Sequence, residues 1–246
     1  MSEDFYRIKR LPPYVFAEVN RLKADYRSKG VDIIDFGMGN PDMDTPHHIV
    51  EKLVETVRKS RTHRYSSSKG INGLRKAQAR YYKNRFDVAL DPEREIIATL
   101  GSKEGLANLA MAITAPGDVM LVPNPSYPIH PYGFMIAGGT LRHLPTLHDG
   151  KFKPEEYMQS LSRAVAHSVP KPVALVVSFP SNPTAQLCDI DFYKELISFA
   201  KKNNLWILSD LAYAEIYFDG NPPPSILQVN GAKEVAVEFT SLSKTF

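Results

Sequence analysis

From residue 93 onward, short apolar runs alternate with longer segments of helical periodicity, and this alternation restricts the possible folds most. The apolar runs predict strands at residues 95–100, 119–122, 140–144, 173–179, 205–209 and 235–239. The segments between them predict helices at residues 106–114, 129–137, 154–166 and 192–202. Strands joined by helices pair in parallel, and the nearly all-apolar run 173–179 suits a strand covered on both faces. The sequence therefore predicts an α/β fold with a mostly parallel sheet and helices on both of its faces.

Length and composition fit a soluble chain with a sizeable core. The chain has 246 residues, of which 43% are hydrophobic. The net charge is +3 and the basic residues are scattered, which argues against a nucleic-acid partner and allows a small anionic ligand. The single cysteine, Cys188, excludes an internal disulfide and fits a reducing compartment. Because no run approaches the roughly 20 apolar residues of a membrane span and no signal-peptide core is found, we expect a cytoplasmic protein without a membrane partner.

The segment before this alternating pattern is less regular. Pro12 and Pro13 predict an extended arm, which is either solvated or packed on a partner subunit. A polar helix is expected at residues 17–28. A short strand is expected at residues 33–36, and it should end at a loop that contains Gly37 and Gly39, where glycine lets a ligand approach the backbone.

Two further helices are expected before the sheet. Thr45 and Pro46 form a cap and first-turn pair for a helix whose apolar positions run to Val57. A polar loop follows, and the next helix is predicted at residues 72–85. Its basic residues are expected to form a solvated face: Arg75, Lys76, Arg80, Lys83 and Arg85.

Polar motifs follow the predicted strands, and ligands of parallel α/β sheets bind beyond these carboxyl ends. Strand 95–100 leads into a helix start, where backbone N–H groups and the Ser102 hydroxyl can cup an anion. A turn without a ligand is the alternative there. Strand 119–122 ends in a proline-rich loop that fixes Tyr127, whose ring can stack on a flat heterocycle or pack on the surface.

Two more strand ends carry polar side chains. Asn182 follows strand 173–179 and can donate to a phenolate oxygen, although Asn-Pro also opens ordinary turns. Asp210 follows strand 205–209, where a buried carboxylate is costly unless a cation such as a protonated pyridine nitrogen pairs with it. Tyr213 can donate to the phenolate oxygen of the same ring. A metal-binding aspartate is the rival interpretation, but no His, Cys or acidic cluster accompanies Asp210, so no metal site is predicted.

The last predicted strand, residues 235–239, leads to Lys244 among small hydroxyl residues. A lysine held at a strand exit can be desolvated, which lowers its pKa and lets its amine form an imine with an aldehyde. The flanking hydroxyls can hold an anion, and pyridoxal phosphate (PLP) is a phosphorylated aldehyde that would use both. Alone, this lysine would be interpreted as a solvated surface residue. The upstream motifs change that, because together they supply a phosphate cup, a stacking ring, an oxygen donor and a ring-nitrogen carboxylate.

In the order and spacing of these motifs, the chain resembles a class I/II aminotransferase of PLP fold type I. The Asn-Pro-Thr loop at Asn182, the Asp-Leu-Ala-Tyr segment at Asp210 and the Ser-Leu-Ser-Lys-Thr-Phe segment at Ser241 carry the resemblance. It covers essentially the whole chain. Within the family, the finer likeness is to bacterial glutamate–pyruvate (alanine) aminotransferases, through residues 11–16, 101–106, 124–128, 179–186 and 210–214.

The resemblance implies a role for each candidate site residue. Lys244 would form the imine and move the substrate proton, and Asp210 would hold the pyridinium. Asn182 and Tyr213 would contact the phenolate oxygen, while Tyr127 would stack on the ring. The remaining implied contacts are with the phosphate for Ser102, Lys103 and Ser241, with the phosphate of a neighbouring subunit for Tyr65, and with the substrate carboxylate for Gly39 and Asn182.

The resemblance also implies domains, an activity and an assembly. Residues 1–45 would form an N-terminal arm and small-domain segment, and residues 46–246 an incomplete large PLP-binding domain. The expected activity is transamination between an amino acid and a 2-oxo acid, above all alanine/pyruvate with glutamate/2-oxoglutarate, in a homodimer.

The family continues beyond the lysine, where arginines bind the phosphate and the substrate carboxylate, so the chain as given is expected to have little activity. The alternatives are an LL-diaminopimelate or aspartate aminotransferase, a C–S lyase on the same fold, and a non-catalytic PLP-binding fragment.

Overall fold

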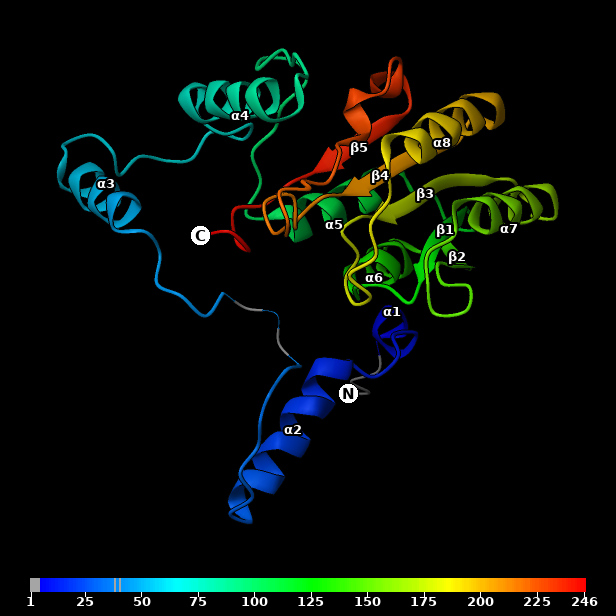
Figure 1. The fold of residues 1–246 in the computed structure, drawn as a ribbon, viewed down its shortest axis with the longest axis horizontal. Coiled ribbons are helices and arrows are strands. Elements are labelled where there is room, and N and C mark those ends of the chain that lie inside the picture. Colours follow the sequence, from blue (N-terminus) through cyan, green and yellow to red (C-terminus); the bar gives the residue numbers. More distant parts are fainter. Residues whose placement is uncertain (1–4, 38, 40) are drawn as a thin grey trace.

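The computed structural model describes residues 5–37, 39 and 41–246. Its centre is a sheet with the strand order β2-β1-β3-β4-β5, in which every neighbouring pair is parallel (Figure 1). The strands are β1 (Val119–Asn124), β2 (Thr140–Pro145), β3 (Pro172–Ser178), β4 (Trp206–Asp210) and β5 (Ala236–Phe239). The predicted parallel α/β sheet is confirmed.

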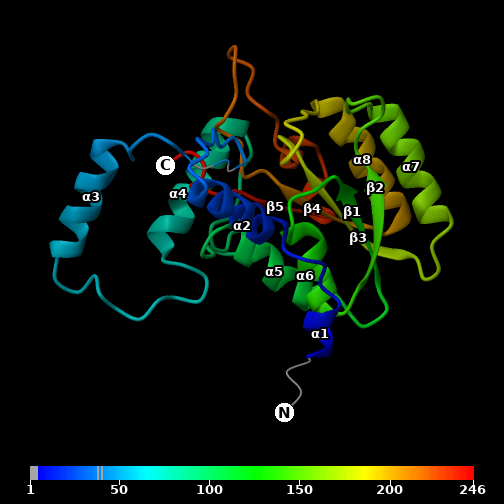
Figure 2. The same ribbon diagram turned by 90° about the horizontal axis from the view of Figure 1, so that it is seen from below.

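Helices cover both faces of this sheet (Figures 1 and 2). One face carries α5 (Ser102–Ile113) and α6 (Ile129–Ala137), and the other carries α7 (Pro154–Ala166) and α8 (Ile190–Asn203). Each helix pair forms its own apolar core with the strands. The first core includes Leu106, Phe134, Met120, Val176 and Leu208, and the second includes Leu161, Leu196, Leu121, Leu175 and Ile207.

Successive residues of a strand point to opposite faces of the sheet. On β4, Ile207 therefore faces α7 and α8 together with Ser209, whereas Leu208 and Asp210 face α5 and α6. Because Ser209 is paired in register with Glu238 of β5, these two residues share a face. The carboxyl ends of β4 and β5 thus present different side chains to the two helix layers.

Helix α8 shows why the helices form close to the predicted positions. The Asp189 carboxylate caps the helix by accepting a hydrogen bond from the Phe192 backbone N–H at 2.8 Å. The helix ends at Asn204, which adopts the left-handed conformation with φ of 52°. Its buried positions recur at helical spacing: Phe192, Tyr193, Leu196, Ile197 and Ala200. Burial of a leucine side chain of this kind stabilises the fold by about 2 kcal/mol.

Two predicted strands, residues 33–36 and 95–100, do not form. No described strand is hydrogen-bonded to either segment. In the second segment Ala98 donates to the Lys69 carbonyl at 3.0 Å, a single contact with a loop, and Leu100 is 91% exposed. An apolar run becomes a strand only when a neighbouring strand pairs with its backbone, and no described strand pairs with either segment.

The remaining helices are α1 (Tyr6–Lys9), α2 (Val15–Ser28), α3 (His47–Arg58) and α4 (Asn72–Phe86), with short 3₁₀ turns at η1 (Ile226–Gln228) and η2 (Ala232–Glu234). The sequence did not predict α1. The expectation that Thr45 caps α3 is wrong, because Pro46 occupies the N-cap position without a side-chain bond. The Thr45 hydroxyl instead donates to the Phe246 carbonyl at 2.8 Å.

The expected solvated basic face of α4 is wrong at Arg75 and Arg85. Arg75 is only 7% exposed, and its guanidinium donates to the Gly70 carbonyl at 3.3 Å and pairs with Glu93 at 3.0 Å. Arg85 pairs with Glu215 at 3.1 Å. A charged side chain is buried only when it is paired. These partners come from other segments, so the periodicity of α4 does not reveal them.

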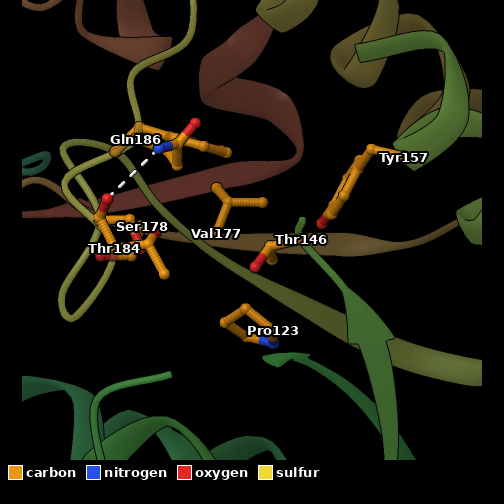
Figure 3. A pocket seen from close by; sticks show the side chains of 9 residues that line it. Pro123, Thr146, Tyr157, Val177, Ser178, Thr184 and Gln186 are labelled. Atoms are coloured by element: carbon orange, nitrogen blue, oxygen red, sulfur yellow. Dashed lines mark hydrogen bonds between the residues drawn. The ribbon is translucent and has the colours of Figure 1, made fainter. Parts of the chain in front are cut away.

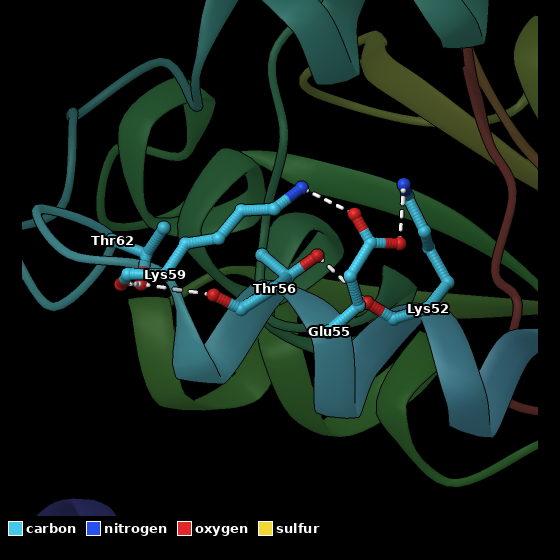
Figure 4. A network of polar contacts seen from close by, with 5 residues as sticks. All are labelled: Lys52, Glu55, Thr56, Lys59 and Thr62. Carbon is cyan, nitrogen blue, oxygen red and sulfur yellow. Dashed lines mark hydrogen bonds and ion pairs between the residues drawn. The ribbon is translucent and has the colours of Figure 1, made fainter.

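Helices α2 and α3 lie away from the sheet (Figure 1). On α3, Glu55 accepts a hydrogen bond from Lys52 at 2.9 Å and another from Lys59, and Thr62 donates to the Lys59 carbonyl at 2.9 Å (Figure 4). The hydrogen bonds from Lys59 and Lys52 lower the pKa of Glu55 to about 2. The same helix exposes apolar side chains, namely Val50, Leu53 and Val57. Local ion pairs thus support α3, while these apolar side chains remain solvent-exposed.

Among the described residues, no helix combines the length and apolarity needed to cross a bilayer. In the same part of the chain, no group of three or more His, Cys, Asp and Glu side chains is arranged to hold a metal ion. Burial raises the pKa of the free thiol of Cys188 to about 12, so this thiol stays protonated and unreactive at neutral pH.

Candidate active site

The carboxyl ends of β3, β4 and β5 bring most of the sequence-predicted residues to one edge of the sheet. Asn182 lies in the turn after β3, Asp210 is the last residue of β4, and Lys244 follows β5. Asp210 is paired in register with Ser178 on one side and with Phe239 on the other. Parallel pairing therefore places at one edge residues that are far apart in the sequence.

Asp210 is buried beside a histidine that the sequence analysis did not identify. The Asp210 carboxyl is 8% exposed; its Oδ2 lies 2.9 Å from Nε2 of His130, and its Oδ1 accepts from the Ala212 backbone N–H at 3.2 Å. His130 lies in the first turn of α6 and is fully buried, and its Nδ1 has no hydrogen-bond partner among the described residues. With the proton on Nε2, His130 donates this hydrogen bond to the Asp210 carboxylate.

The only sequence signal for His130 is its place three residues after Tyr127, at a predicted helix start. That position gives no indication of a carboxylate partner, because the contact joins α6 to β4 and exists only once the helix packs on the sheet. In the structure, the rings of Tyr127 and His130 meet edge to face with their centroids 6.2 Å apart.

Asn182 and Tyr213 contact each other directly. The Asn182 side-chain amide donates to the Tyr213 hydroxyl oxygen at 3.0 Å. Burial raises the pKa of Tyr213; the hydrogen bond from Asn182 lowers it, and the nearby charge of Asp210 raises it. The phenol therefore keeps its proton at neutral pH and can donate it in a hydrogen bond to an oxyanion.

The Lys244 amine lies between Tyr213 and the N-terminal segment. Its Nζ donates to the Gly39 carbonyl at 3.1 Å and lies 5.9 Å from the centroid of the Tyr213 ring. Gly39, which is predicted from the family resemblance to contact the substrate carboxylate, is thus adjacent to the Lys244 amine. The side chain of Lys244 is only partly buried, so the amine is open to a reactant.

The expected anion site lies at the N-terminus of α5. Ser102 is the first residue of this helix, and Gly101 before it adopts φ of 86°, a conformation that favours glycine. The Lys103 ammonium lies 5.8 Å from the centroid of the Tyr127 ring, which links the anion site to the proposed stacking ring. Helix dipole, hydroxyl and ammonium together favour a phosphate at this end.

Two of the predicted site residues, Ser241 and Tyr65, make no described contact with the other members of this cluster. The Ser241 hydroxyl accepts from the Ser243 backbone N–H at 3.1 Å, which orders the turn before Lys244. Tyr65 is fully exposed in the loop between α3 and α4, so within this chain its side chain packs against none of the other candidates.

A small cavity lies beside the end of β3, next to Val177 and Ser178 (Figure 3). It is lined by hydroxyl-bearing residues that include Thr146, Tyr157, Ser178 and Thr184. None of the candidate site residues lines it. The cavity adjoins the site, because its lining residue Ser178 is the register partner of Asp210 and Ser181 precedes Asn182.

The donor set fits PLP in its chemistry. Asp210 already accepts from His130 and from a backbone N–H, and a carboxylate with about four lone-pair sites has room for a pyridinium. Tyr213 and Asn182 are donors suited to a ring oxygen, Lys244 is an amine suited to an aldehyde, and the α5 N-terminus suits a phosphate. The cluster therefore offers a group suited to each part of PLP, on the parallel α/β fold expected from the sequence.

Sequence comparison identifies the family. The profile of the family described as aminotransferase class I and II matches residues 31–246. The chain therefore belongs to the class I and II aminotransferase family, whose members depend on PLP. Both the family and the cofactor predicted from the sequence are confirmed.

Similar proteins carry related names. AatC of Rhizobium meliloti, whose assignment as an aminotransferase is itself provisional, is 62% identical over 99% of this chain and 59% of its own length. The glutamate-pyruvate aminotransferase AlaC of Escherichia coli is 50% identical over 98% of this chain and 58% of its length. An LL-diaminopimelate aminotransferase of Aquifex aeolicus is 46% identical over 100% of this chain and 62% of its length. The chain thus spans about three-fifths of the length of these relatives.

Solved structures share the fold. Substrate-bound BacF from Bacillus subtilis matches with a TM-score of 0.87 at 33% identity, over 100% of this chain and 61% of that one. A mutant Thermus thermophilus aspartate aminotransferase matches with a TM-score of 0.86 at 28% identity, over 100% of this chain and 62% of that one. Both similarities extend over the whole chain, as the expectation of fold type I requires.

Proposed function

We propose that this chain forms the PLP-binding part of a transaminase that moves an amino group between an amino acid and a 2-oxo acid. The observation that carries the proposal is the Asp210 carboxylate, buried at the end of β4 and held by His130 and the Ala212 N–H. A carboxylate fixed in this way, at the same sheet edge as Tyr213 and Lys244, suits the ring nitrogen of PLP. Bound PLP supplies an electron sink for removal of the substrate α-proton.

Each residue has a distinct task in this proposal. The Lys244 amine would hold the cofactor aldehyde and move the substrate proton, and the Asp210 carboxylate would hold the ring nitrogen. Asn182 and Tyr213 donate to the ring oxygen, and Tyr127 stacks on the ring. The N-terminus of α5 with Ser102 and Lys103, together with Ser241, binds the phosphate, while Gly39 and Asn182 bind the substrate carboxylate.

Cofactor binding is tested on residues 1–246 with PLP. We expect an absorbance band of the Lys244-bound cofactor, and after borohydride reduction a pyridoxyl group on the peptide that contains Lys244. Lys244→Ala should lose the band, while Lys194→Ala, a surface lysine paired with Asp191, should keep it. Attachment at other lysines in equal yield would contradict the proposal.

For the substrate pair we propose alanine/pyruvate with glutamate/2-oxoglutarate. The support is the identity to AlaC, and the LL-diaminopimelate aminotransferases are close competitors at similar identity. The test uses an extended chain, in which residues 1–246 are followed by the remaining residues of AlaC. Alanine with 2-oxoglutarate should give the highest kcat/KM. A preference for LL-diaminopimelate or aspartate would replace the pair, and release of ammonia and pyruvate from a cysteine conjugate would indicate a C–S lyase.

For the assembly we propose a homodimer in which α3 and the following loop meet a second copy. Val50, Leu53 and Val57 form an exposed apolar stripe on α3, and Tyr65 is fully exposed in the loop behind it. We also propose that residues 1–45 are an arm and small-domain segment and that residues 46–246 are the large domain. In analytical ultracentrifugation of the extended chain, Leu53→Glu should shift a dimer toward monomer, whereas Glu51→Gln on the same helix should not.

A further inference from the structure

The turn that carries Tyr213 is held from α4 by contacts that the proposed chemistry does not use. Glu215 lies two residues after Tyr213, and its Oε1 accepts from the Tyr81 hydroxyl at 2.5 Å and from Arg85 Nε at 3.1 Å. Arg85 Nη2 also donates to the Ala214 carbonyl at 3.2 Å. The residues on the C-terminal side of Tyr213 are therefore fixed by two side chains of one helix.

Aromatic packing holds Arg85 in place for these bonds. Its guanidinium lies 4.7 Å from the centroid of the Phe86 ring and 5.5 Å from that of Tyr217. Tyr81 meets Phe86 edge to face with the centroids 5.9 Å apart. The guanidinium spans a carboxylate and a carbonyl at once, a geometry that a lysine ammonium does not reproduce.

Three further hydrogen bonds hold the turn, and one of them comes from β5 on the N-terminal side of Tyr213. The Leu211 N–H donates to the Phe239 carbonyl of β5 at 2.8 Å, and Ile216 N–H donates back to the Tyr213 carbonyl at 3.1 Å. The Asn182 amide reaches the Tyr213 hydroxyl at 3.0 Å. The residues before Tyr213 are thus bonded to β5, the residues after it are bonded to α4, and its hydroxyl contacts Asn182.

We propose that Tyr81 and Arg85, acting through Glu215, are positioning residues that hold the Tyr213 hydroxyl in reach of the cofactor's ring oxygen. This inference rests on the proposed function, because the oxygen belongs to PLP. The three residues touch neither Lys244 nor Asp210 in the described contacts, so their effect on the chemistry passes through Tyr213.

The consequence is a spectroscopic signature. In Lys244-bound PLP, the lysine nitrogen can carry a proton that it shares with the ring oxygen. A phenol that donates to this oxygen stabilises its negative charge after that proton has left. Loss of that donor makes the proton harder to remove, so the pH midpoint of the absorbance of Lys244-bound PLP rises. A residue with a merely structural role lowers stability without moving this midpoint.

The experiment compares variants of residues 1–246 loaded with PLP and titrated from pH 5 to 10. Tyr81→Phe keeps the ring and removes the hydroxyl, and we expect the midpoint to rise by about half a pH unit or more. In a Tyr213→Phe background the same change should leave the midpoint where Tyr213→Phe alone puts it. Glu215→Gln keeps an acceptor for Tyr81 and should shift the midpoint less than Glu215→Ala. Tyr26→Phe, at an exposed tyrosine of α2, is the matched control.

A second measurement needs no cofactor. Amide hydrogen exchange of Ala214 and Ile216 should become about tenfold faster in Tyr81→Phe and stay unchanged in Tyr26→Phe. Unchanged exchange in Tyr81→Phe, an unmoved midpoint, or an equal shift in the Tyr213→Phe background would each overturn the inference alone. Failure of the unsubstituted chain to attach PLP at Lys244 would overturn the proposed function, and the inference with it.

Discussion

The two faces of the sheet each carry one carboxylate near the ends of neighbouring strands, buried Asp210 and partly buried Glu238, and their surroundings differ. Asp210 of β4 faces α6 and accepts two hydrogen bonds, from His130 and from the Ala212 N–H. Glu238 of β5 faces the other way and accepts four. Its donors are the Tyr82 hydroxyl at 3.0 Å, the Ser209 hydroxyl at 3.1 Å, the Ser225 hydroxyl at 2.5 Å and the Ile226 N–H at 3.1 Å.

The number of hydrogen-bond donors distinguishes the two carboxylates. A carboxylate has about four lone-pair sites. Glu238 uses its four to tie α4, β4 and η1 to β5, so it has no capacity left for a ligand. Asp210 keeps part of its capacity at the edge where Tyr213 and Lys244 lie. We infer that Glu238 holds the strand before Lys244 in place, while Asp210 is reserved for a cation.

The largest effect on stability is expected for Glu238→Ala. The substitution leaves the Tyr82, Ser209, Ser225 and Ile226 donors without their acceptor, and an unsatisfied buried polar group costs about 1–3 kcal/mol. We expect a loss of about 3 kcal/mol or more in the free energy of unfolding, measured by urea denaturation. Asp191→Ala, which removes an exposed acid paired with Lys194, should change it by less than about 1 kcal/mol. Equal losses in both variants would contradict the structural assignment of Glu238.

Asp210→Asn is expected to lower activity strongly while leaving stability nearly unchanged. The amide fits the same space and still bonds to His130, so the free energy of unfolding should change by less than about 1 kcal/mol. In the extended chain, kcat should nevertheless fall by about 100-fold or more, as when one preorganised electrostatic partner is removed. PLP should remain attached to Lys244. Near-normal turnover by this variant would show that Asp210 does not hold the ring nitrogen.

An intermediate effect is expected for Tyr82→Phe. This change removes one of the four donors to Glu238 while the ring stays packed against Phe86, 5.4 Å away between centroids. The loss of one hydrogen bond of this kind costs about 1 kcal/mol. Tyr26→Phe on the exposed helix α2 should cost nothing measurable in the same urea assay. A Tyr82→Phe protein as stable as the Tyr26→Phe control would mean that the four donors are redundant.

The comparison also shows what the sequence could predict. The helices α6 and α7 begin and end at the predicted residues, because apolar spacing and the flanking prolines and glycines are local signals. Asp210, Asn182, Tyr213 and Lys244 were found for a related reason. Each follows an apolar run, and parallel pairing places the ends of such runs together.

The errors arise where an interaction joins distant segments. His130 and Glu238 each bond to residues that only the packed fold brings near them. Arg85 was predicted to be solvated because its partner Glu215 is far away in the sequence. The segment 95–100 has the apolarity of a strand but no described neighbour. Hydrophobic periodicity indicates which side chains are favoured for burial. It does not indicate which residues from distant segments will pack against them or pair with them.

The smallest expected effect is a pH dependence in the contribution of Glu238 to the free energy of unfolding. Burial raises the pKa of Glu238 above its ordinary 4.5, and the hydrogen bonds from Ser225, Ile226, Tyr82 and Ser209 lower it only in part. Above pH 4.5 the unfolded chain has released this proton while the folded protein still holds it. The stability contributed by Glu238 is therefore greatest below that pH and declines as the pH rises through the folded-state pKa.

Glu238→Gln isolates this contribution, because an amide does not titrate. Other acids have a lowered pKa, such as Glu95 with its hydrogen bonds from the Asp91 N–H and Lys233. Their contribution to the stability of the protein is lost as the pH falls, which is the opposite trend. They are common to both proteins, so they cancel in the difference. We expect the stability advantage of the unsubstituted protein over Glu238→Gln, measured in urea from pH 4.5 upward, to shrink as the pH rises. If the free energies of unfolding of the two proteins stayed parallel over this pH range, the four donors would be keeping the Glu238 carboxyl charged throughout, and the expectation would be wrong.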